Sequence, residues 1–448
     1  RYSGIPLRTY GQQEADIIGI VEPLTKHATM ITDPKHIVFE MDKALYLAKT
    51  GRKGPVWIDV PLDIQNMRIN PEELEHFVPA DDSIFMPSTE DIEYVIKAFQ
   101  SAERPVLMLG SGVRSAGAIP ELEKLVDKYS IPVTYASSAT DAYGTSNQLS
   151  VGTVGSLGGT RAGNFAVQNS DLLLVLGCRL SPLTTGPDYD NFARASKVIV
   201  VDIDKVEHSK NTVRIDRLII SDVKQFLDIL TKKNIRKAST EWQNTCFHWK
   251  QVFPKCEDIY KLTDKVDLYY LAECLSETLS HDVVLISDSG LEELIIPSTV
   301  SFRKGQRCIH PVSQGSMGFA LPGAVGAYFA SGRPTVAVIG DGSIMMNLQE
   351  LQTIRYHNLP IKIIVVNNNV YSVIRNRQAD LFRTRTIGTD PSNGVGCPSF
   401  QKVSESFEIP YVRIDNSAEL KSILTSVINA DGPVLCEVMA VEDQNYLR

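Results

Sequence analysis

The chain has 448 residues, which exceeds the size of one hydrophobic core and suits about three domains of roughly 150 residues each. Its formal net charge of −8 argues against nucleic acid or an anionic membrane as a partner, and no apolar run reaches the roughly eighteen residues of a membrane span. Seven scattered cysteines without a CxxC pair, and a polar start without a signal peptide, predict a reduced protein in the cytoplasm.

Residues 1–80 have the pattern of the second half of an α/β domain. Apolar residues at helical spacing predict a helix over 34–50, and a loop signal at 51–55 leads into a buried strand at 56–61. Residues 66–88 are polar and contain several prolines, which is typical of a linker between domains.

Residues 89–232 alternate strand and helix signals, which predicts a parallel, doubly wound sheet. The expected strands are 105–109, 131–135, 171–176 and 197–202. The turn at Gly110 and Gly112 follows the first strand, and alone it is best interpreted as a tight strand-to-helix turn. Asp202 ends the last strand, where an acidic side chain can hold a ribose hydroxyl.

Residues 233–265 are interpreted as a linker with helical pieces, whose tryptophans are expected to pack rather than bind. Residues 266–448 have the pattern of a third α/β unit. Its expected strands are 283–287, 335–339, 361–366 and 433–438. The last of these is expected to close the sheet.

One βαβ segment of the third unit carries polar residues at both of its strand ends. Asp341 follows the strand at 335–339, and Asn368 follows the strand at 361–366. Ligands bind outside the carboxyl ends of parallel strands, and these hard oxygen donors suit Mg²⁺ or Ca²⁺ rather than zinc. The backbone N–H groups of Gly342 and Ser343 can bind an anion. The pattern therefore favours a cradle for Mg²⁺ and a diphosphate over an ordinary βαβ core unit with a turn aspartate.

This segment resembles the cofactor signature of thiamine diphosphate (ThDP) enzymes, a Gly-Asp-Gly turn followed by a helix and an Asn-Asn pair. The sequence of the expected helix, residues 346–355, resembles that of the acetolactate synthase branch of the family. The resemblance implies an α/β fold of three doubly wound parallel-sheet domains. They are a partial pyrimidine-binding domain (1–80), a central Rossmann-like domain (89–232) and a diphosphate-binding domain (266–448).

The resemblance also implies an activity and its cofactors. With ThDP and Mg²⁺, a 2-keto acid such as pyruvate is decarboxylated, and its two-carbon unit is transferred to a second carbonyl compound. The coenzyme lies between subunits in this family, so a homodimer or homotetramer is implied.

Several residues of the third domain match coenzyme and metal positions of the family. Met317 matches the apolar residue that wedges between the two coenzyme rings, and the carbonyl of Gly315 matches the acceptor of the aminopyrimidine N–H. The implied metal ligands are Asp341, Asn368 and the carbonyl of Val370. The other implied coenzyme contacts are Ser289, Gly290, Gly342, Ser343, Tyr371, Ser372 and Val373.

The chain departs from the family beside the expected diphosphate. Acetolactate synthases place Gln-His after the glycine that matches Gly290, whereas Leu291, Glu292 and Glu293 follow here. A carboxylate near diphosphate oxygens is repulsive unless it is turned away or paired. Either this loop points elsewhere or it handles the diphosphate in a different way.

In the first domain, Gln13 and Lys26 match residues near the substrate channel. A solvated surface lysine is an equally weighted interpretation of Lys26. The part of this domain that carries the activating glutamate precedes this point in the family, so we expect it to lie before the first residue given. Glu14 and Glu22 do not match its sequence context.

The central domain resembles one that carries FAD in some relatives. The matching positions are Gly110, Gly112, Gly177, Arg179, Asp202 and Asp222. Two departures stand beside them, because Leu157-Gly158 replaces a Met-His pair and Ser181-Pro182 replaces two aspartates. FAD and an empty or differently filled pocket are therefore equally weighted alternatives.

Arg375 and Arg377 replace residues that border the acceptor channel in typical acetolactate synthases. Guanidinium groups bind phosphate well, so a phosphorylated acceptor such as a nucleotide sugar would fit there. The alternatives to plain acetolactate formation are thus a specialised carboligase acting on a sugar or phosphorylated acceptor, a non-oxidative 2-keto acid decarboxylase, and a non-catalytic relative.

Overall fold

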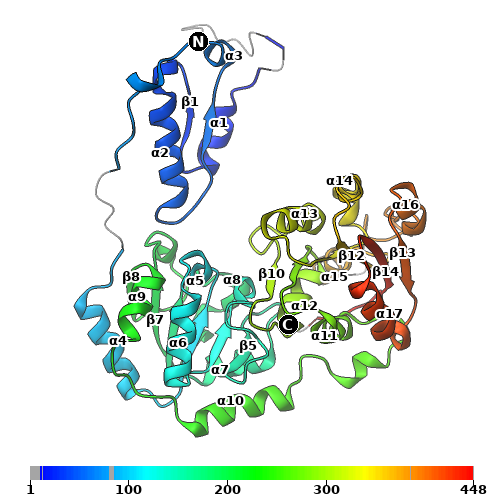
Figure 1. The fold of residues 1–448 in the computed structure, drawn as a ribbon. Coiled ribbons are helices and arrows are strands. Elements are labelled where there is room, and N and C mark those ends of the chain that lie inside the picture. Colours follow the sequence, from blue (N-terminus) through cyan, green and yellow to red (C-terminus); the bar gives the residue numbers. More distant parts are fainter. Residues whose placement is uncertain (1–10, 13, 80–84, 384, 447–448) are drawn as a thin grey trace. The chain divides into compact units, whose positions relative to one another are not determined.

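The computed structural model describes residues 11–12, 14–79, 85–383 and 385–446. The chain divides into two compact units, Arg1–Met86 with Ile203–Glu207, and Pro87–Asp202 with His208–Arg448 (Figure 1). Every named strand pairs in parallel with its neighbours, which confirms the expected α/β class. None of the described helices is both long enough and apolar enough to cross a membrane.

The described residues of the first unit contain one βαβ crossover. Strands β1 (Ala28–Met30) and β2 (Trp57–Asp59) pair in parallel and are joined through α2 (Ile37–Lys49), the helix that the periodicity predicts. The expectation that the second strand is buried is wrong within this unit, because Trp57 is 41% exposed. Two short helices flank them, α1 (Ile17–Val21) and α3 (Leu62–Gln65).

The second unit contains two six-stranded parallel sheets, of which the first is central in the sequence. Its strands, in spatial order, are β5 (Ser150–Thr153), β4 (Val133–Tyr135), β3 (Pro105–Leu109), β6 (Leu172–Leu176), β7 (Lys197–Asp202) and β8 (Arg217–Ile220). The four strands expected from sequence are present, and β5 and β8 extend the sheet at its edges. The order reverses between β3 and β6, which is the arrangement of dinucleotide-binding sheets.

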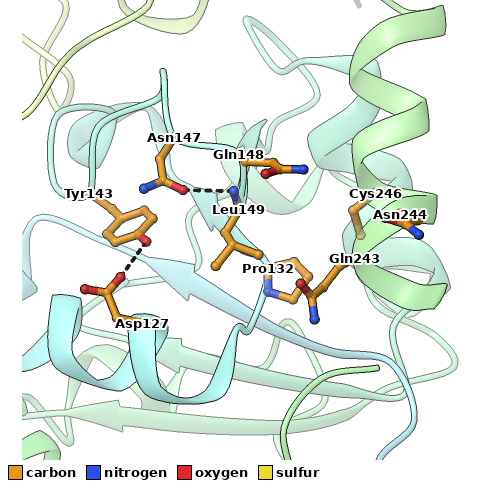
Figure 2. Close-up of a pocket in the computed structure, with 9 residues that line it drawn as sticks. All are labelled: Asp127, Pro132, Tyr143, Asn147, Gln148, Leu149, Gln243, Asn244 and Cys246. Carbon is orange, nitrogen blue, oxygen red and sulfur yellow. Dashed lines mark hydrogen bonds between the residues drawn. The ribbon is translucent and has the colours of Figure 1, made fainter. Parts of the chain in front are cut away.

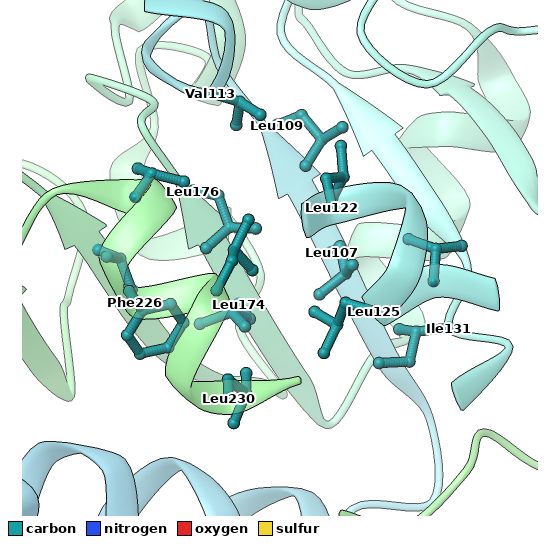
Figure 3. Close-up of a cluster of buried hydrophobic side chains, with 14 of the residues drawn as sticks. Leu107, Leu109, Val113, Leu122, Leu125, Ile131, Leu174, Leu176, Phe226 and Leu230 are labelled. Atoms are coloured by element: carbon teal, nitrogen blue, oxygen red, sulfur yellow. The ribbon is translucent and has the colours of Figure 1, made fainter. Parts of the chain in front are cut away.

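Helices cover both faces of the central sheet. One face packs against α4 (Thr89–Ser101), α6 (Ile119–Tyr129) and α9 (Val223–Leu230), with Leu107, Leu174 and Phe226 in the shared core (Figure 3). The other face packs against α7 (Arg161–Asn169) and α10 (Thr240–Val252). The segment interpreted as a linker thus contributes α10 to this core, where Trp242 is buried as a packing residue. The short helices of this part are α5 (Gly112–Ser115) and α8 (Pro182–Thr185).

The second sheet contains the βαβ segment singled out from the sequence. Its strands, in spatial order, are β10 (Arg307–Ile309), β9 (Val284–Ser287), β11 (Thr335–Gly340), β12 (Ile361–Asn367), β14 (Val434–Met439) and β13 (Tyr411–Ile414). The expectation that the last strand closes this sheet is wrong. Strand β14 inserts between β12 and β13, because its apolar run suits a position buried on both faces.

Helices also cover both faces of the second sheet (Figure 1). One face packs against α11 (Leu268–Thr278), α12 (Leu291–Thr299) and α17 (Ser417–Asn429), and the other against α13 (Ala320–Ser331), α14 (Glu350–Tyr356) and α16 (Phe400–Ser406). Helix α15 (Ser372–Phe382) follows the expected metal loop. After β9 the chain forms β10 on one side of β9 and then β11 on its other side. A topological switch point therefore lies between β9 and β11.

A buried carboxylate joins the two halves of the second unit. Asp141 follows β4, and its side chain accepts from Arg307 Nε at 2.7 Å and from the backbone N–H of Cys308 at 3.1 Å. Arg114 Nη2 lies 3.2 Å from the same carboxylate. The Asp141 side chain is 4% exposed, and the two arginines are about one third exposed.

We expect Asp141→Asn to lower the stability of the second unit by about 2–3 kcal/mol, less than for a fully buried pair because both arginines reach water. The measurement is the midpoint of thermal unfolding. Glu408→Gln, which removes an exposed pair with Arg355 at 2.8 Å, is the control and should cost under about 1 kcal/mol. Equal shifts for the two variants would contradict a central role for Asp141.

Candidate coenzyme and metal site

The residues predicted to form the site converge at the switch point of the second sheet. Asp288–Gly290 follow β9, Asp341–Ser343 follow β11, and Asn368–Val370 follow β12. Because β11 lies between β9 and β12 and all three run in parallel, their carboxyl ends meet at one edge. This edge is where ligands bind in open parallel sheets, so it is the candidate site.

Asp341 is buried and is held by the backbone. Its Oδ1 accepts from the N–H of Gly342 at 2.6 Å, and its Oδ2 accepts from the N–H of Asn369 at 2.6 Å. Burial raises the pKa of Asp341 to about 6, against the lowering effect of these hydrogen bonds. A cation beside this carboxylate would offset the cost of burying its charge.

The loop after β12 presents the other two predicted ligands. Asn369 adopts a left-handed conformation with φ 57°, which makes the loop turn sharply between Asn368 and Val370. The Asn368 side chain donates to Ser372 Oγ at 2.8 Å and accepts from the N–H of Val370 at 3.2 Å. No three His, Cys, Asp or Glu side chains converge as a metal site in the described part of the chain. The implied set instead combines one carboxylate, one carboxamide and one carbonyl.

Asp288 holds the segment that carries the predicted coenzyme contacts Gly315 and Met317. Its carboxylate accepts from the N–H of Gly318 at 3.0 Å and from the N–H of Ala320 at 2.6 Å. Burial raises the pKa of Asp288, again against the effect of its hydrogen bonds. Sequence analysis gave Asp288 no functional role, although an acidic residue directly after a strand is a signal that could have found it.

Position 315 favours glycine because its φ of 59° lies in the left-handed region, which other residues rarely adopt. The position of a Cβ there would lie 3.6 Å from Ser289 Oγ and 3.7 Å from Glu293 Oε2. Met317 is 37% exposed, so a predicted wedge residue presents part of its side chain at the surface of this unit. The predicted residues Ser289, Gly315 and Met317 thus belong to one region of the site.

Glu292 belongs to the segment after Gly290 in which the sequence departs from acetolactate synthases. It lies in the first turn of α12 and is buried, with one carboxylate oxygen 3.1 Å from the position of a Cβ on Gly340 and the other 2.8 Å from that on Gly290. Burial, and then the charges of Asp341 and Asp288, raise the pKa of Glu292 to about 8. This shift favours the protonated form, and a protonated carboxyl can donate a hydrogen bond to an anion instead of repelling it.

The remaining loop residues pack closely at the start of α15. The position of a Cβ on Gly342 would lie 1.8 Å from Tyr371 Cε1, so only glycine allows the ring to approach the turn this closely. Ser343 is buried in the turn after β11. Ser372 and Val373 form the first turn of α15, directly after the expected carbonyl ligand of Val370.

The first unit contributes one described candidate. The ammonium of Lys26 donates to the carbonyls of Thr50, at 2.7 Å, and of Leu47, at the C-terminal end of α2. It therefore caps a helix within its own unit. Gln13 lies outside the described residues.

Four predicted nucleotide positions follow β3 and β6, at the switch point of the central sheet, whereas Asp202 ends β7 and Asp222 follows β8. Gly112 N–H donates to Gly177 O at 3.0 Å, and a Cβ on Gly112 would lie 2.6 Å from Gly177 Cα, so the glycines permit direct contact of two turns. Asp222 caps α9 by accepting from the N–H groups of Lys224 and Gln225.

Two further nucleotide candidates have basic side chains nearby. Asp202 lies 3.3 Å from Nε2 of His208, and the carbonyl of Arg179 accepts from Lys210 Nζ at 2.7 Å. These contacts neither require nor exclude a nucleotide.

A separate cavity of about 340 Å³ lies in the central part, between α6, α10 and the loop at 143–149 (Figure 2). Its lining residues are Asp127, Pro132, Tyr143, Asn147, Gln148, Leu149, Gln243, Asn244 and Cys246. The Tyr143 hydroxyl donates to Asp127 at 3.3 Å. None of these residues belongs to the predicted coenzyme set, so we do not assign the coenzyme to this cavity.

Comparison with known proteins gives the family. Residues 92–230 match the central domain of thiamine pyrophosphate enzymes, and residues 288–438 match their C-terminal TPP binding domain. The acetolactate synthase large subunit of Porphyra purpurea is 31% identical over 442 residues, which cover 97% of this chain and 74% of that protein.

Two other relatives agree with this assignment. The large subunit of Corynebacterium glutamicum is 32% identical over 449 residues, which are 98% of this chain and 71% of that protein. Acetolactate synthase 2, chloroplastic, of Zea mays is 30% identical over 468 residues, which cover 99% of this chain and 71% of that protein. The chain therefore belongs to the thiamine diphosphate-dependent enzymes, in the branch of the acetolactate synthase large subunits.

Proposed function

We propose that the enzyme uses ThDP and Mg²⁺ to decarboxylate a 2-keto acid, pyruvate by default, and to join the two-carbon unit to a second carbonyl compound. The observation that carries this proposal is the loop pair at the switch point, where Asp341 binds the backbone of the Asn368–Val370 turn. The similarity to acetolactate synthases over nearly the whole chain supports the same reaction class.

The residues present fit the implied groups. A carboxylate, a carboxamide and a backbone carbonyl are hard oxygen donors that suit Mg²⁺, which usually also binds substrate phosphates. Asp341 is buried with a raised pKa, and a bound cation would stabilise its ionised form. Protonated Glu292 and the N–H group of Ser343 would bind the diphosphate oxygens, whereas the Gly342 N–H already donates to Asp341.

ThDP, when bound, supplies the carbanion that attacks the keto acid, so the protein need not provide a base at that carbon. The Gly315 carbonyl would accept the aminopyrimidine N–H, and Met317 would hold the two coenzyme rings in a bent shape. Asp288 fixes both residues in place through Gly318 and Ala320.

Assembly and the central domain are part of the same proposal. A homodimer or homotetramer is supported by exposed apolar side chains on the segment from α13 to α14, among them Phe329, Met346 and Tyr356. The strand order of the central sheet supports an adenine nucleotide such as FAD at Gly110, Gly177 and Asp202, with an empty or differently filled pocket as the equally weighted alternative.

A carboligase that acts on a phosphorylated acceptor is the second candidate function, and the free charge of Arg377 favours it. Its neighbour Arg375 is already neutralised, because it binds Glu442 at 2.7 Å and Asp443 at 2.5 Å and lies 3.9 Å from Asp390. Arg377 is exposed and has no hydrogen-bond or ion-pair partner among the residues that the structure describes. Of the two arginines singled out from sequence, Arg377 is the one with an unused charge.

The first experiment measures carbon dioxide release and product identity from pyruvate with ThDP and Mg²⁺. Acetolactate as the product would establish the plain synthase reaction, and acetaldehyde would establish a simple decarboxylase. Release that requires a second carbonyl compound would establish a specialised carboligase. No turnover of any 2-keto acid would overturn the proposal in favour of a non-catalytic relative.

We expect Asp341→Asn to raise the Kd for Mg²⁺ at least about tenfold in the presence of ThDP, since the one charged side chain of the implied ligand set is lost. Calorimetric titration of Mg²⁺ measures this change. Asp415→Asn removes an exposed carboxylate 2.7 Å from Arg413 and should leave the Kd unchanged. An unaltered Kd in Asp341→Asn would show that the metal binds elsewhere.

Glu292→Gln should remove a pH dependence of coenzyme binding. The pKa of Glu292 is raised to about 8, so in the wild type the carboxyl ionises as pH rises through 8, and a negative charge then opposes the diphosphate. ThDP affinity should fall by up to about tenfold per pH unit above that value, and Glu292→Gln should lack this fall. Equilibrium binding at pH 7 to 9.5 is the measurement.

The raised pKa of Glu292 also makes the free energy of unfolding depend on pH. Because the folded-state pKa lies above the ordinary value of 4.5, protonation stabilises the fold, and this contribution declines as pH rises from 4.5 to about 8. Glu277→Gln, on the exposed face of α11, serves as the control for both measurements. A fall in affinity that persists in Glu292→Gln would assign it to another group.

Arg377→Ala should raise the KM for a phosphorylated acceptor by about tenfold or more, with little change in the KM for pyruvate. Arg214→Ala, at an exposed arginine of the central part, is the matched control. If every phosphorylated acceptor keeps its KM, the second candidate function is wrong.

A further inference from the structure

Glu437 is a buried carboxylate in the middle of an otherwise apolar strand. It lies on β14, flanked by Cys436 and Val438, and is 5% exposed. Burying an ionisable group costs free energy unless its oxygens are hydrogen-bonded. A strand in this position is filled most simply by aliphatic side chains, so the partners of Glu437 show what the carboxylate does.

Two donors use the two oxygens of Glu437. Asn367 Nδ2 donates to Oε1 at 2.6 Å, and the Tyr411 hydroxyl donates to Oε2. The register explains the first contact, because Glu437 pairs with Val365 and Asn367 lies two residues further along β12 on the same face. Tyr411 lies on β13, on the other side of β14.

The Asn367 carboxamide connects Glu437 to the expected metal loop. Its Oδ1 accepts from the N–H of Asn369 at 3.1 Å, the N–H that also donates to Asp341 Oδ2. Asn369 is the left-handed residue between Asn368 and Val370. One backbone N–H is therefore shared between the predicted ligand Asp341 and the side chain that Glu437 holds.

The carboxylate also decides which way the carboxamide points. An ionised carboxylate only accepts, so it selects the NH₂ group of Asn367 as its neighbour. The carbonyl oxygen must then face the Asn369 N–H. Without the carboxylate, the amide could turn and place a donor against that N–H, and the loop would lose the contact that supports its left-handed turn.

We propose that Glu437 is a positioning residue for the Mg²⁺ site, which acts through Asn367 to fix the Asn368–Val370 turn relative to Asp341. The inference rests on the proposed function, because that function supplies the metal. It adds a residue far along the chain, on a strand that carries no predicted ligand. Groups that hold metal ligands in this indirect way typically change metal affinity by about 10–100-fold when they are removed.

The test compares three variants of the full chain by calorimetric titration of Mg²⁺ with ThDP saturating. Glu437→Ala should raise the Kd for Mg²⁺ about 10–100-fold. Glu437→Gln should stay within about threefold of the wild type, since its carbonyl can accept from Asn367 while its NH₂ donates to the Tyr411 oxygen. Tyr411→Phe removes the other partner of the carboxylate and should also stay within about threefold.

Thermal unfolding of the metal-free chain separates positioning from simple destabilisation. Tyr411→Phe should lower the unfolding midpoint without moving the Mg²⁺ Kd. An equal rise in Kd for Tyr411→Phe and Glu437→Ala would overturn the inference, because any damage to this strand would then suffice. A wild-type Kd in Glu437→Ala would overturn it as well, and would leave the proposed function standing.

Asn367→Ala keeps the test decisive if Glu437→Ala does not fold. It should raise the Kd to a similar extent, and the double variant should show less than the product of the two effects, because both residues act through one contact. Full multiplication of the effects would overturn the inference. A wild-type chain that binds no Mg²⁺ with ThDP would overturn the proposed function together with it.

Discussion

Two carboxylates at adjacent strand ends, Asp288 and Asp341, organise the second sheet's ligand edge. Each follows a strand that borders the switch point, and each is buried with its oxygens bonded to backbone N–H groups. Asp288 binds the segment before α13, and Asp341 binds the loop after β12. These bonds join chain segments that are distant in sequence, so the site exists only when the parallel sheet is assembled in this order.

The same burial sets the electrostatic character of the site. Asp288, Asp341 and Glu292 lie within one small region, and burial raises the pKa of each. Such a group of acids is unfavourable as three charges in a low dielectric. A proton on Glu292 and a divalent cation beside Asp341 would relieve this repulsion. An anionic coenzyme accompanied by Mg²⁺ suits this arrangement, whereas an anion alone does not.

Polar contacts join the central sheet to the second sheet within the same unit. Asp141 binds Arg307 beside β10, and Thr145 Oγ1 accepts from the N–H of Phe302 at 2.7 Å. These polar contacts fix one sheet against the other within the second unit. The central switch point itself is closed by contact between the turns at Gly112 and Gly177, so its glycines are explained by packing before any nucleotide is considered.

The sequence by itself determined the α/β class, most strands and the position of Asp341, Gly342 and Asn368 at strand ends. These features depend on local apolar runs and on the rule that ligands bind at the carboxyl ends of parallel strands. It also marked the departure at Glu292, without showing what the carboxylate does.

Only the tertiary structure decided the contacts between residues that are far apart in the chain. It placed β14 between β12 and β13, which brings Glu437 beneath Asn367, and it paired Arg375 with Glu442 and Asp443. It also decided that the pKa of Glu292 is raised, because a pKa depends on burial and on neighbouring charges. Sheet order and burial are properties of the assembled core, and local sequence patterns do not encode them.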